Sequence, residues 1–322
     1  MPIDPIIADA EARAITLMSS IAVTSPTEQR ALALRVDEEV VLPLVASPPP
    51  TSVGVSVRVV SVPVAGRRPV SVHIYTPDDG EASPDARTGH LFFFGGAFRQ
   101  GGLHFPSVDA ILRARAAKAQ AVIVAPQYAL APEEPYPAAI EQATAVLRWM
   151  ADSAADLGID PSALSIGGMS AGGDIAAVLA LVNRDGDGIP IRRQILEVPV
   201  ADLTGGHLTL DVAEHLGLDA DAMVPMMREL AENYLAGADP LSPTVSPLFA
   251  PDLSGLPPAH VLVAEFDVFR GDGEAYAAAL QKHGTPSTLH RFAGMTHGSL
   301  AYTRGVDGAR EWERTVVDLL RR

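Results

Sequence analysis

Short apolar runs alternate with segments of helical composition from residue 90 to the C-terminus, and this alternation constrains the fold more than any other feature of the chain. The apolar runs have the length of buried strands and are too short for typical helices. Strands that alternate with helices form a mostly parallel sheet through right-handed crossovers, with helices on both faces. We therefore expect an α/β fold. The predicted strands are residues 91–94, 121–124, 163–167, 194–198, 260–264 and 287–292, and the predicted helices are 107–119, 138–151, 174–182, 274–282 and 307–320.

The segments outside this alternation predict additional parts of the molecule. The N-terminal residues to about 45 have helical composition, and the Pro48–Pro50 run after them predicts a stiff connector. Alternating β-branched segments at 53–62 and 69–75 predict antiparallel strands ahead of the main sheet. The interval from 201 to 240 contains no strand pattern, only segments of helical composition such as 220–235. We expect a core built from residues 46–200 and 241–322, with helical additions from residues 1–45 and 201–240.

Charge and composition exclude several classes of partner. The chain has 24 basic and 39 acidic residues, for a formal charge of −15, and no basic cluster. Nucleic acids and anionic membrane surfaces are therefore not expected partners. The chain has no cysteine, and no apolar stretch reaches the about 18 residues of a membrane span. The N-terminus shows no leader-like pattern, so we expect a soluble cytoplasmic protein.

The pentapeptide Gly168-Met169-Ser170-Ala171-Gly172 predicts a nucleophilic serine. It lies between a predicted strand and a predicted helix, as in a nucleophile elbow. Such a turn reverses sharply, so the positions two before and two after the serine must be nearly free of side chain. Glycine meets that requirement. Ser170 is therefore the candidate nucleophile.

A serine hydroxyl needs a base, an acid that orients the base, and donors for the developing oxyanion. His297 is the candidate base, because it lies in a loop of small residues after the last predicted strand. Asp267 follows the strand at 260–264 and is the favoured acid. Its rival, Asp272, precedes a helix next to a glycine and is more naturally an N-cap. The order Ser170, Asp267, His297 is that of α/β-hydrolases.

Backbone amides of two segments are the candidate oxyanion donors. One amide belongs to Ala171, the residue after the nucleophile. The other segment is the loop 94–98, where Gly95 and Gly96 let the backbone approach a substrate oxygen. Alone, this loop would indicate only a tight turn. Beside the elbow, it predicts an oxyanion hole.

Taken together, these motifs resemble the hormone-sensitive-lipase-like family of esterases, the bacterial family IV carboxylesterases. The loop 94–98 corresponds to the family's H-G-G-G-[FW], and residues 128–133 (Y-A-L-A-P-E) correspond to Y-R-L-A-P-E. Residues 168–173 (G-M-S-A-G-G) correspond to G-D-S-A-G-G, and residues 246–270 lead to a counterpart of D-P-L-R-D. With residues 294–298, the resemblance extends from about residue 60 to the C-terminus.

The resemblance implies an α/β-hydrolase core with a helical cap from the N-terminal segment and the 201–240 insertion, and it makes a homodimer plausible. It implies Ser170 as nucleophile, His297 as base and acid, and Asp267 as orienting acid. Three positions differ from the family pattern. Phe94 replaces a histidine, so its ring cannot hold backbone by hydrogen bonds; Met169 replaces an aspartate, and Ala129 replaces an arginine.

An esterase for apolar short-to-medium acyl esters is the leading interpretation. The same triad chemistry would serve a lactone, a carbonate or an activated amide, and other readings are a ligand-binding relative without catalysis and a non-hydrolytic acyltransferase or lyase. Candidate substrate-binding residues, which could equally be core residues, are Phe98, Met169, Leu208, Met223, Met226 and Met227. No ligand spacing or phosphate loop stands out, so we expect neither a metal nor an organic cofactor.

Overall fold

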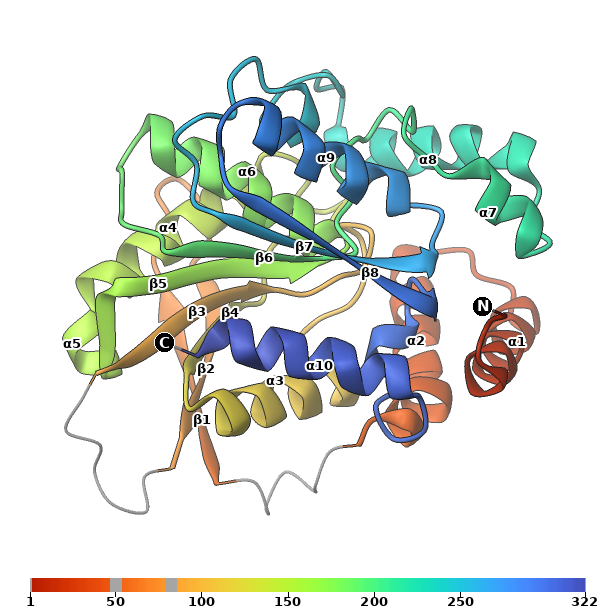
Figure 1. Ribbon diagram of the computed structural model, residues 1–322, viewed down its shortest axis with the longest axis horizontal. Coiled ribbons are helices and arrows are strands. Elements are labelled where there is room, and N and C mark those ends of the chain that lie inside the picture. Colours follow the sequence, from red (N-terminus) through yellow and green to blue (C-terminus); the bar gives the residue numbers. More distant parts are fainter. Residues whose placement is uncertain (1, 47–53, 79–85, 322) are drawn as a thin grey trace.

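The computed structural model describes residues 2–46, 54–78 and 86–321, and its centre is one eight-stranded sheet (Figure 1). The strand order is β1-β2-β4-β3-β5-β6-β7-β8. β1 and β2 pair antiparallel with each other, and β2 pairs antiparallel with β4. All later pairs are parallel. The strands are β1 (Val55–Val62), β2 (Val70–Pro77), β3 (Arg87–Phe93), β4 (Val122–Pro126), β5 (Ile159–Met169), β6 (Arg193–Glu197), β7 (Ala259–Phe266) and β8 (Ser287–Thr296).

Helices cover both faces of the sheet. Figure 1 shows α3 and α10 against one face, and α4, α6 and α9 against the other. A second group, α1, α7 and α8, lies at the end toward which the parallel strands point. The helices are α1 (Pro5–Ser19), α2 (Pro26–Val36), α3 (Pro106–Ala119), α4 (Ala138–Asp152), α5 (Ala154–Leu157), α6 (Ala171–Asp185), α7 (Leu210–His215), α8 (Ala220–Leu235), α9 (Arg270–Lys282) and α10 (Asp307–Leu320), with a π-helical turn η1 (Asp37–Val41) and 3₁₀ turns η2 (Leu42–Leu44), η3 (Pro247–Phe249) and η4 (Ser299–Ala301).

The structure confirms the α/β fold predicted from the alternation. Each predicted strand and helix is present, and the predicted helices at 220–235 and 307–320 match α8 and α10 in both bounds. The main differences are in length: β5 begins at Ile159 and α6 at Ala171, so each extends beyond its predicted segment. β3 ends at Phe93, which leaves Phe94 in the loop that follows. The predicted proline connector and residue 53 lie outside the described residues.

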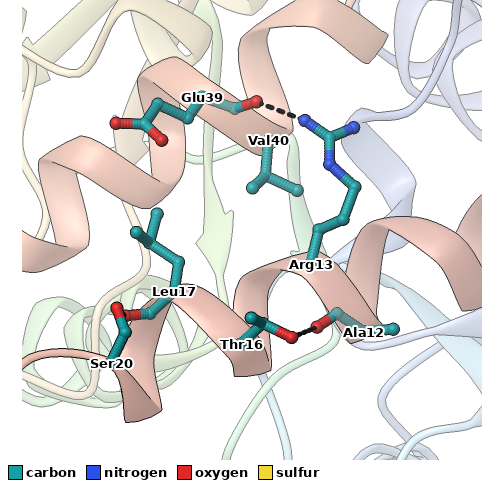
Figure 2. A pocket seen from close by; sticks show the side chains of 7 residues that line it. All are labelled: Ala12, Arg13, Thr16, Leu17, Ser20, Glu39 and Val40. Carbon is teal, nitrogen blue, oxygen red and sulfur yellow. Dashed lines mark hydrogen bonds between the residues drawn. The ribbon is translucent and has the colours of Figure 1, made fainter.

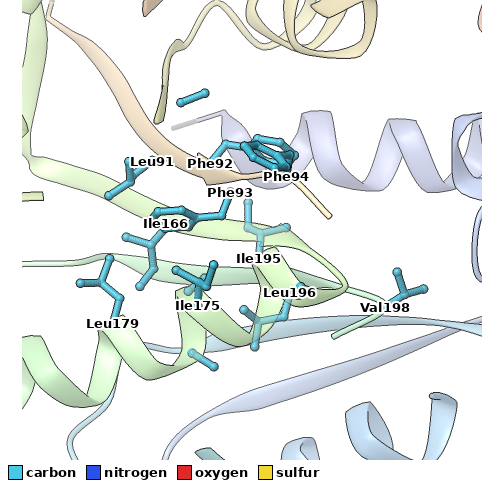
Figure 3. Packing of buried hydrophobic residues seen from close by; sticks show 14 of the residues in the cluster. Leu91, Phe92, Phe93, Phe94, Ile166, Ile175, Leu179, Ile195, Leu196 and Val198 are labelled. Atoms are coloured by element: carbon cyan, nitrogen blue, oxygen red, sulfur yellow. The ribbon is translucent and has the colours of Figure 1, made fainter. Parts of the chain in front are cut away.

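Apolar side chains from the central strands and α6 form the core beneath the elbow (Figure 3). Every residue of β4 is buried, as expected for a strand covered on both faces. Ile175 and Leu179, one helical turn apart on α6, are completely buried against this sheet. This packing fixes the helix that follows Ser170 and therefore the direction of the elbow.

The N-terminal helices begin with local capping interactions. The Asp4 side chain accepts a hydrogen bond from the Ile6 amide at 2.8 Å, and Ser25 accepts one from the Glu28 amide at 3.2 Å. Such caps satisfy amides that have no partner within the helix. Within the three described ranges, no helix is long and apolar enough to cross a membrane.

Candidate active site

Ser170 lies on a sharp turn between β5 and α6. Its backbone has φ 53° and ψ −119°, a conformation that costs about 1–3 kcal/mol and persists only where its surroundings enforce it. A side chain at Gly172 would overlap the carbonyl oxygen of Phe93, and one at Gly168 would overlap that of Gly172. The Ser170 amide donates to the Glu197 carbonyl at 2.9 Å, which ties the turn to β6. The steric reasoning from the pentapeptide therefore describes the turn that forms.

His297 and Asp267 lie beside the serine in a hydrogen-bonded row. The Nε2 atom of His297 is 3.0 Å from Ser170 Oγ, and its Nδ1 atom is 2.8 Å from Asp267 Oδ2. The Asp267 side chain is fully buried, whereas that of His297 is 34% exposed. The Phe269 amide donates to the other Asp267 oxygen at 2.9 Å, which fixes the carboxylate. Residues from the ends of β5, β7 and β8 thus meet at one edge of the sheet, as is usual for α/β proteins.

The environment of His297 changes its basicity in two opposing ways. Burial lowers the pKa of the imidazole, but the Asp267 charge and hydrogen bond and the charge of Glu11 raise it. The effects of Asp267 and Glu11 together outweigh that of burial, so the pKa of His297 lies above its ordinary value. A stronger base is better able to take a proton from a hydroxyl, provided that the pH keeps it neutral.

Asp272 does not cap the helix, and this part of the sequence interpretation was wrong. It lies inside the first turn of α9, which begins at Arg270. Its Oδ2 atom accepts hydrogen bonds from the amides of Ala201 and Asp202 at 3.0 and 3.1 Å. The side chain is buried, and these bonds connect α9 to the segment after β6.

The Gly95 loop lies directly against the nucleophile. A Cβ atom at Gly95 would be 3.4 Å from the Ser170 Cβ. Gly96 has φ 144°, and a side chain there would overlap the carbonyl oxygen of Gln100. Ala171 is buried at the start of α6, where amides have no helical partner. The three predicted oxyanion donors therefore belong to the two segments that meet at Ser170.

The positions that differ from the family pattern are occupied as follows. The Phe94 ring stacks on Tyr128 with 4.1 Å between ring centroids, and the Tyr128 hydroxyl donates to the Phe94 carbonyl at 2.7 Å. Tyr128 thus braces the loop through a backbone carbonyl. The Ala129 amide donates to Gln142 at 2.6 Å. Met169, at the end of β5, is half-buried.

The predicted substrate-binding residues differ in how deeply they are buried. Phe98 is buried and stacks on Tyr234 of α8, with 3.9 Å between ring centroids. Met223 and Met227 are buried on one face of α8, whereas Met226 is 48% exposed. Leu208 is half-buried, and its side chain lies with that of Met227 beside Gly205. A substrate role for these five residues and for Met169 stays a prediction.

A hollow of about 380 Å³ lies between α1 and η1 (Figure 2). Arg13 crosses it and donates to the Glu39 carbonyl at 2.8 Å. The hollow is lined by Ala12, Arg13, Thr16, Leu17, Ser20, Glu39 and Val40, none of which is a predicted site residue. Among the residues that the structure describes, no group of three or more His, Cys, Asp or Glu side chains could hold a metal ion.

Three residues near the predicted site were missed from the sequence. Glu11 of α1 exerts its charge on His297, and the Phe269 ring centroid lies 5.2 Å from that of His297. Arg30 of α2 contacts the loop after Gly96. Phe269 was detectable in principle, because it follows Asp267 by two residues. Glu11 and Arg30 gave no signal, because their partners lie far away in the sequence.

Three features define the α/β-hydrolase class of proteins: a mostly parallel sheet, a serine on a strand–helix turn, and, later in the sequence, an aspartate and then a histidine. Here the histidine contacts the serine and the aspartate contacts the histidine. Comparison with known proteins gives the same class. A family model described as the alpha/beta hydrolase fold matches residues 90–301.

The carboxylesterase NlhH of Mycobacterium tuberculosis is 40% identical over 227 residues, which cover 69% of each chain. The esterase LipI of the same species is 35% identical over 260 residues, covering 79% of this chain and 78% of LipI. Among solved structures, an esterase of Pyrobaculum calidifontis superposes with a TM-score of 0.83 at 30% identity, covering 99% of this chain and 98% of the esterase.

The chain belongs to the alpha/beta hydrolase family, in its hormone-sensitive-lipase-like branch. The family and fold predicted from the sequence are therefore confirmed.

Proposed function

We propose that the protein is a serine carboxylic-ester hydrolase in which Ser170 is the nucleophile, His297 the general base and acid, and Asp267 the orienting acid. The observation that carries this proposal is the row of hydrogen bonds from Ser170 Oγ through His297 to Asp267, at 3.0 and 2.8 Å. The esterase class agrees with the named activities of NlhH, LipI and the Pyrobaculum protein.

The reaction proceeds in two acyl transfers. Ser170 Oγ attacks the ester carbonyl carbon while His297 Nε2 takes the hydroxyl proton, which gives a tetrahedral oxyanion. Collapse of this intermediate breaks the bond to the alcohol oxygen, and His297 returns the proton to the leaving alcohol. A water molecule then attacks the acyl-enzyme with His297 again as base, and the acid leaves as Ser170 regains its proton.

The oxyanion is stabilised by the amides of Gly95, Gly96 and Ala171. Backbone donors that are fixed before the reaction act strongly, because they need not reorganise as charge develops. The strained turn at Ser170 and the close approach of Gly95 support this assignment. Removal of one such donor typically costs about 3 kcal/mol of transition-state stabilisation.

The acyl group is apolar and short to medium in length in this proposal. The candidate contacts are apolar side chains, and flexible thioethers adapt to acyl groups of different shapes. Phe98, Met223 and Met227 are buried where α8 meets the core, while Met169 and Leu208 are half-buried. The exposed Met226 would contact substrate only at the outer edge of such a pocket.

The test is hydrolysis of p-nitrophenyl butyrate by the wild type and by Ser170→Ala, with mass spectrometry after treatment with an organophosphonate. We expect a loss of about 10⁴-fold or more in kcat for Ser170→Ala, and a single label on Ser170 in the wild type. Ser165→Ala is the matched control, because Ser165 also contacts a histidine, His90, at 2.9 Å but is buried in β5. Full activity of Ser170→Ala, or a label on Ser165, would refute the assignment.

The acyl preference needs a substrate panel. Esters of increasing acyl length, a lactone, a carbonate and an activated amide share this acyl-transfer chemistry and are separated by their kcat/KM values. Tight binding without turnover would instead indicate a ligand-binding protein.

We also propose that the protein is cytoplasmic and forms a homodimer. The absence of cysteine suits a reducing compartment. Cell fractionation tests the location, and light scattering coupled to size-exclusion chromatography tests the dimer.

A further inference from the structure

The loop after Gly95 contains two residues in a strained conformation. Ala97 and Phe98 have φ of 52° and 60°, in the left-handed region that residues with a side chain rarely adopt. Such a residue persists only when the surrounding structure enforces its conformation. Contacts from outside the loop are therefore needed to keep the Gly95 and Gly96 amides in place.

The loop's own hydrogen bonds close only one side of it. The amides of Arg99 and Gln100 donate to the Gly96 carbonyl at 3.1 and 3.0 Å. The Phe98 carbonyl instead accepts from the amide of Ala131 at 2.9 Å, in a separate segment. The position of Phe98 therefore depends on the position of Ala131.

Arg30 of α2 joins these two segments. Its Nε atom donates to the Arg99 carbonyl at 2.8 Å, and its Nη2 atom donates to the Ala131 carbonyl at 2.9 Å. The same guanidinium is held by the two Glu133 oxygens at 3.0 and 2.6 Å. The side chain of Arg30 is 28% exposed, so its bonds to the carbonyls are partly shielded from water.

We propose that Arg30 is a positioning residue for the oxyanion hole, because one guanidinium from the N-terminal segment fixes both the Arg99 carbonyl of the strained loop and the Ala131 segment that holds Phe98. It does not touch substrate. The inference rests on the proposed esterase function, and it explains how the loop stays in place although Phe94 offers no polar side chain.

The guanidinium is required by geometry as well as charge. Four bonds leave it in one plane toward two carbonyls and one carboxylate. A lysine ammonium is a compact donor that cannot reproduce this planar fork. We therefore expect Arg30→Lys to keep an attraction to Glu133 but to lose part of the hold on the loop.

The experiment compares Arg30→Met, Arg30→Lys and Glu133→Gln with the wild type on p-nitrophenyl butyrate. Arg35→Met is the matched control, because Arg35 lies on the same helix and pairs with Glu39 at 2.6 Å on the surface. Loss of a whole oxyanion donor costs about 10²–10³-fold in kcat, so a displaced loop should cost roughly 10–100-fold. KM should change little, because the interaction is made in the transition state.

Added guanidinium should partly restore the activity of Arg30→Met, at concentrations well below those that unfold the protein. A hollow of about 420 Å³ reaches Arg30, Ala129 and Glu133 and gives the ion access. A merely structural role would not respond in this way. The rate of phosphonate labelling at Ser170 should fall and recover in parallel with kcat, while Glu133→Gln should stay near the wild type.

The outcomes separate this inference from the proposed function. No ester hydrolysis and no labelling of Ser170 in the wild type would overturn the proposed function itself. An active wild type with unchanged kcat in Arg30→Met or Arg30→Lys would overturn only the role of Arg30. A loss in Glu133→Gln equal to that in Arg30→Met would also overturn it, because the ion pair alone would then explain the effect. If Arg30→Met does not fold, Arg30→Lys decides by its kcat and its labelling rate.

Discussion

The perturbation Arg115→Met should destabilise the protein strongly, because it leaves a buried carboxylate without its cation. Arg115 of α3 donates to both oxygens of Glu197 at 2.7 and 2.8 Å and to Glu313 at 2.9 Å. The indole of Trp312 donates to the same Glu197 at 2.7 Å. The side chains of Arg115 and Glu197 are only 2% and 1% exposed. After the substitution, Glu197 loses both bonds from Arg115 and keeps the bond from Trp312.

The magnitude follows from the burial of both charges. Removal of one partner of a buried ion pair costs about 3–5 kcal/mol, since the remaining charge stays desolvated. The entropy of unfolding is about 2.1 cal/mol/K per residue, so over 322 residues this loss lowers Tm by roughly 4–7 °C. The double variant Arg115→Met/Glu197→Leu removes both of these charges and should recover part of the loss, because replacing both partners of a buried pair by apolar side chains is often neutral. The recovery is incomplete because Glu313 still lacks Arg115.

The assay is urea unfolding followed by circular dichroism, together with thermal melts. Arg35→Met is the control, because its exposed pair with Glu39 contributes only about 0.3–0.5 kcal/mol. A loss below about 1 kcal/mol for Arg115→Met, far under the range for a buried pair, would refute the reasoning. So would a double variant that is as unstable as Arg115→Met.

Three further outcomes are expected. Glu11→Gln removes a charge that raises the pKa of His297, so this base stays neutral to lower pH and the acid limb of the kcat/KM profile moves down; an upward shift would contradict the interpretation. Burial raises the pKa of Asp174 well above its usual range. The folded protein therefore loses stability as the pH rises from the ordinary pKa of an aspartate toward this raised pKa. Asp174→Asn should therefore raise Tm at neutral and alkaline pH and flatten its pH dependence, which thermal melts across pH will measure. Gly172→Ala should prevent stable folding because the methyl group overlaps a backbone carbonyl, whereas Gly298→Ala, with no atom within 4 Å, should melt within a few degrees of the wild type.

The local rules of the sequence were sufficient for the sheet and the elbow. Strand lengths and helix patterns act over a few residues, so α8 and α10 could be bounded from sequence alone. The requirement for glycine at 168 is likewise local, because a side chain there would overlap the carbonyl oxygen of Gly172 in the same turn. At 172 the clash is instead with the carbonyl oxygen of Phe93, on a neighbouring strand. The candidate serine, aspartate and histidine were found because each directly follows a strand at the same edge of the sheet.

Tertiary structure decided what surrounds those residues. Local sequence around Asp272 suggested a cap, yet its partners are amides about 70 residues away, across the fold. The bond from Arg30 to the Arg99 carbonyl and the pair of Arg115 with Glu197 join segments 69 and 82 residues apart. Such contacts leave no periodic pattern, because they depend on how whole helices pack on the sheet. The sequence by itself therefore determined the architecture and the candidate triad, whereas only the packing of distant segments decided which charges are buried and which contacts hold the oxyanion loop.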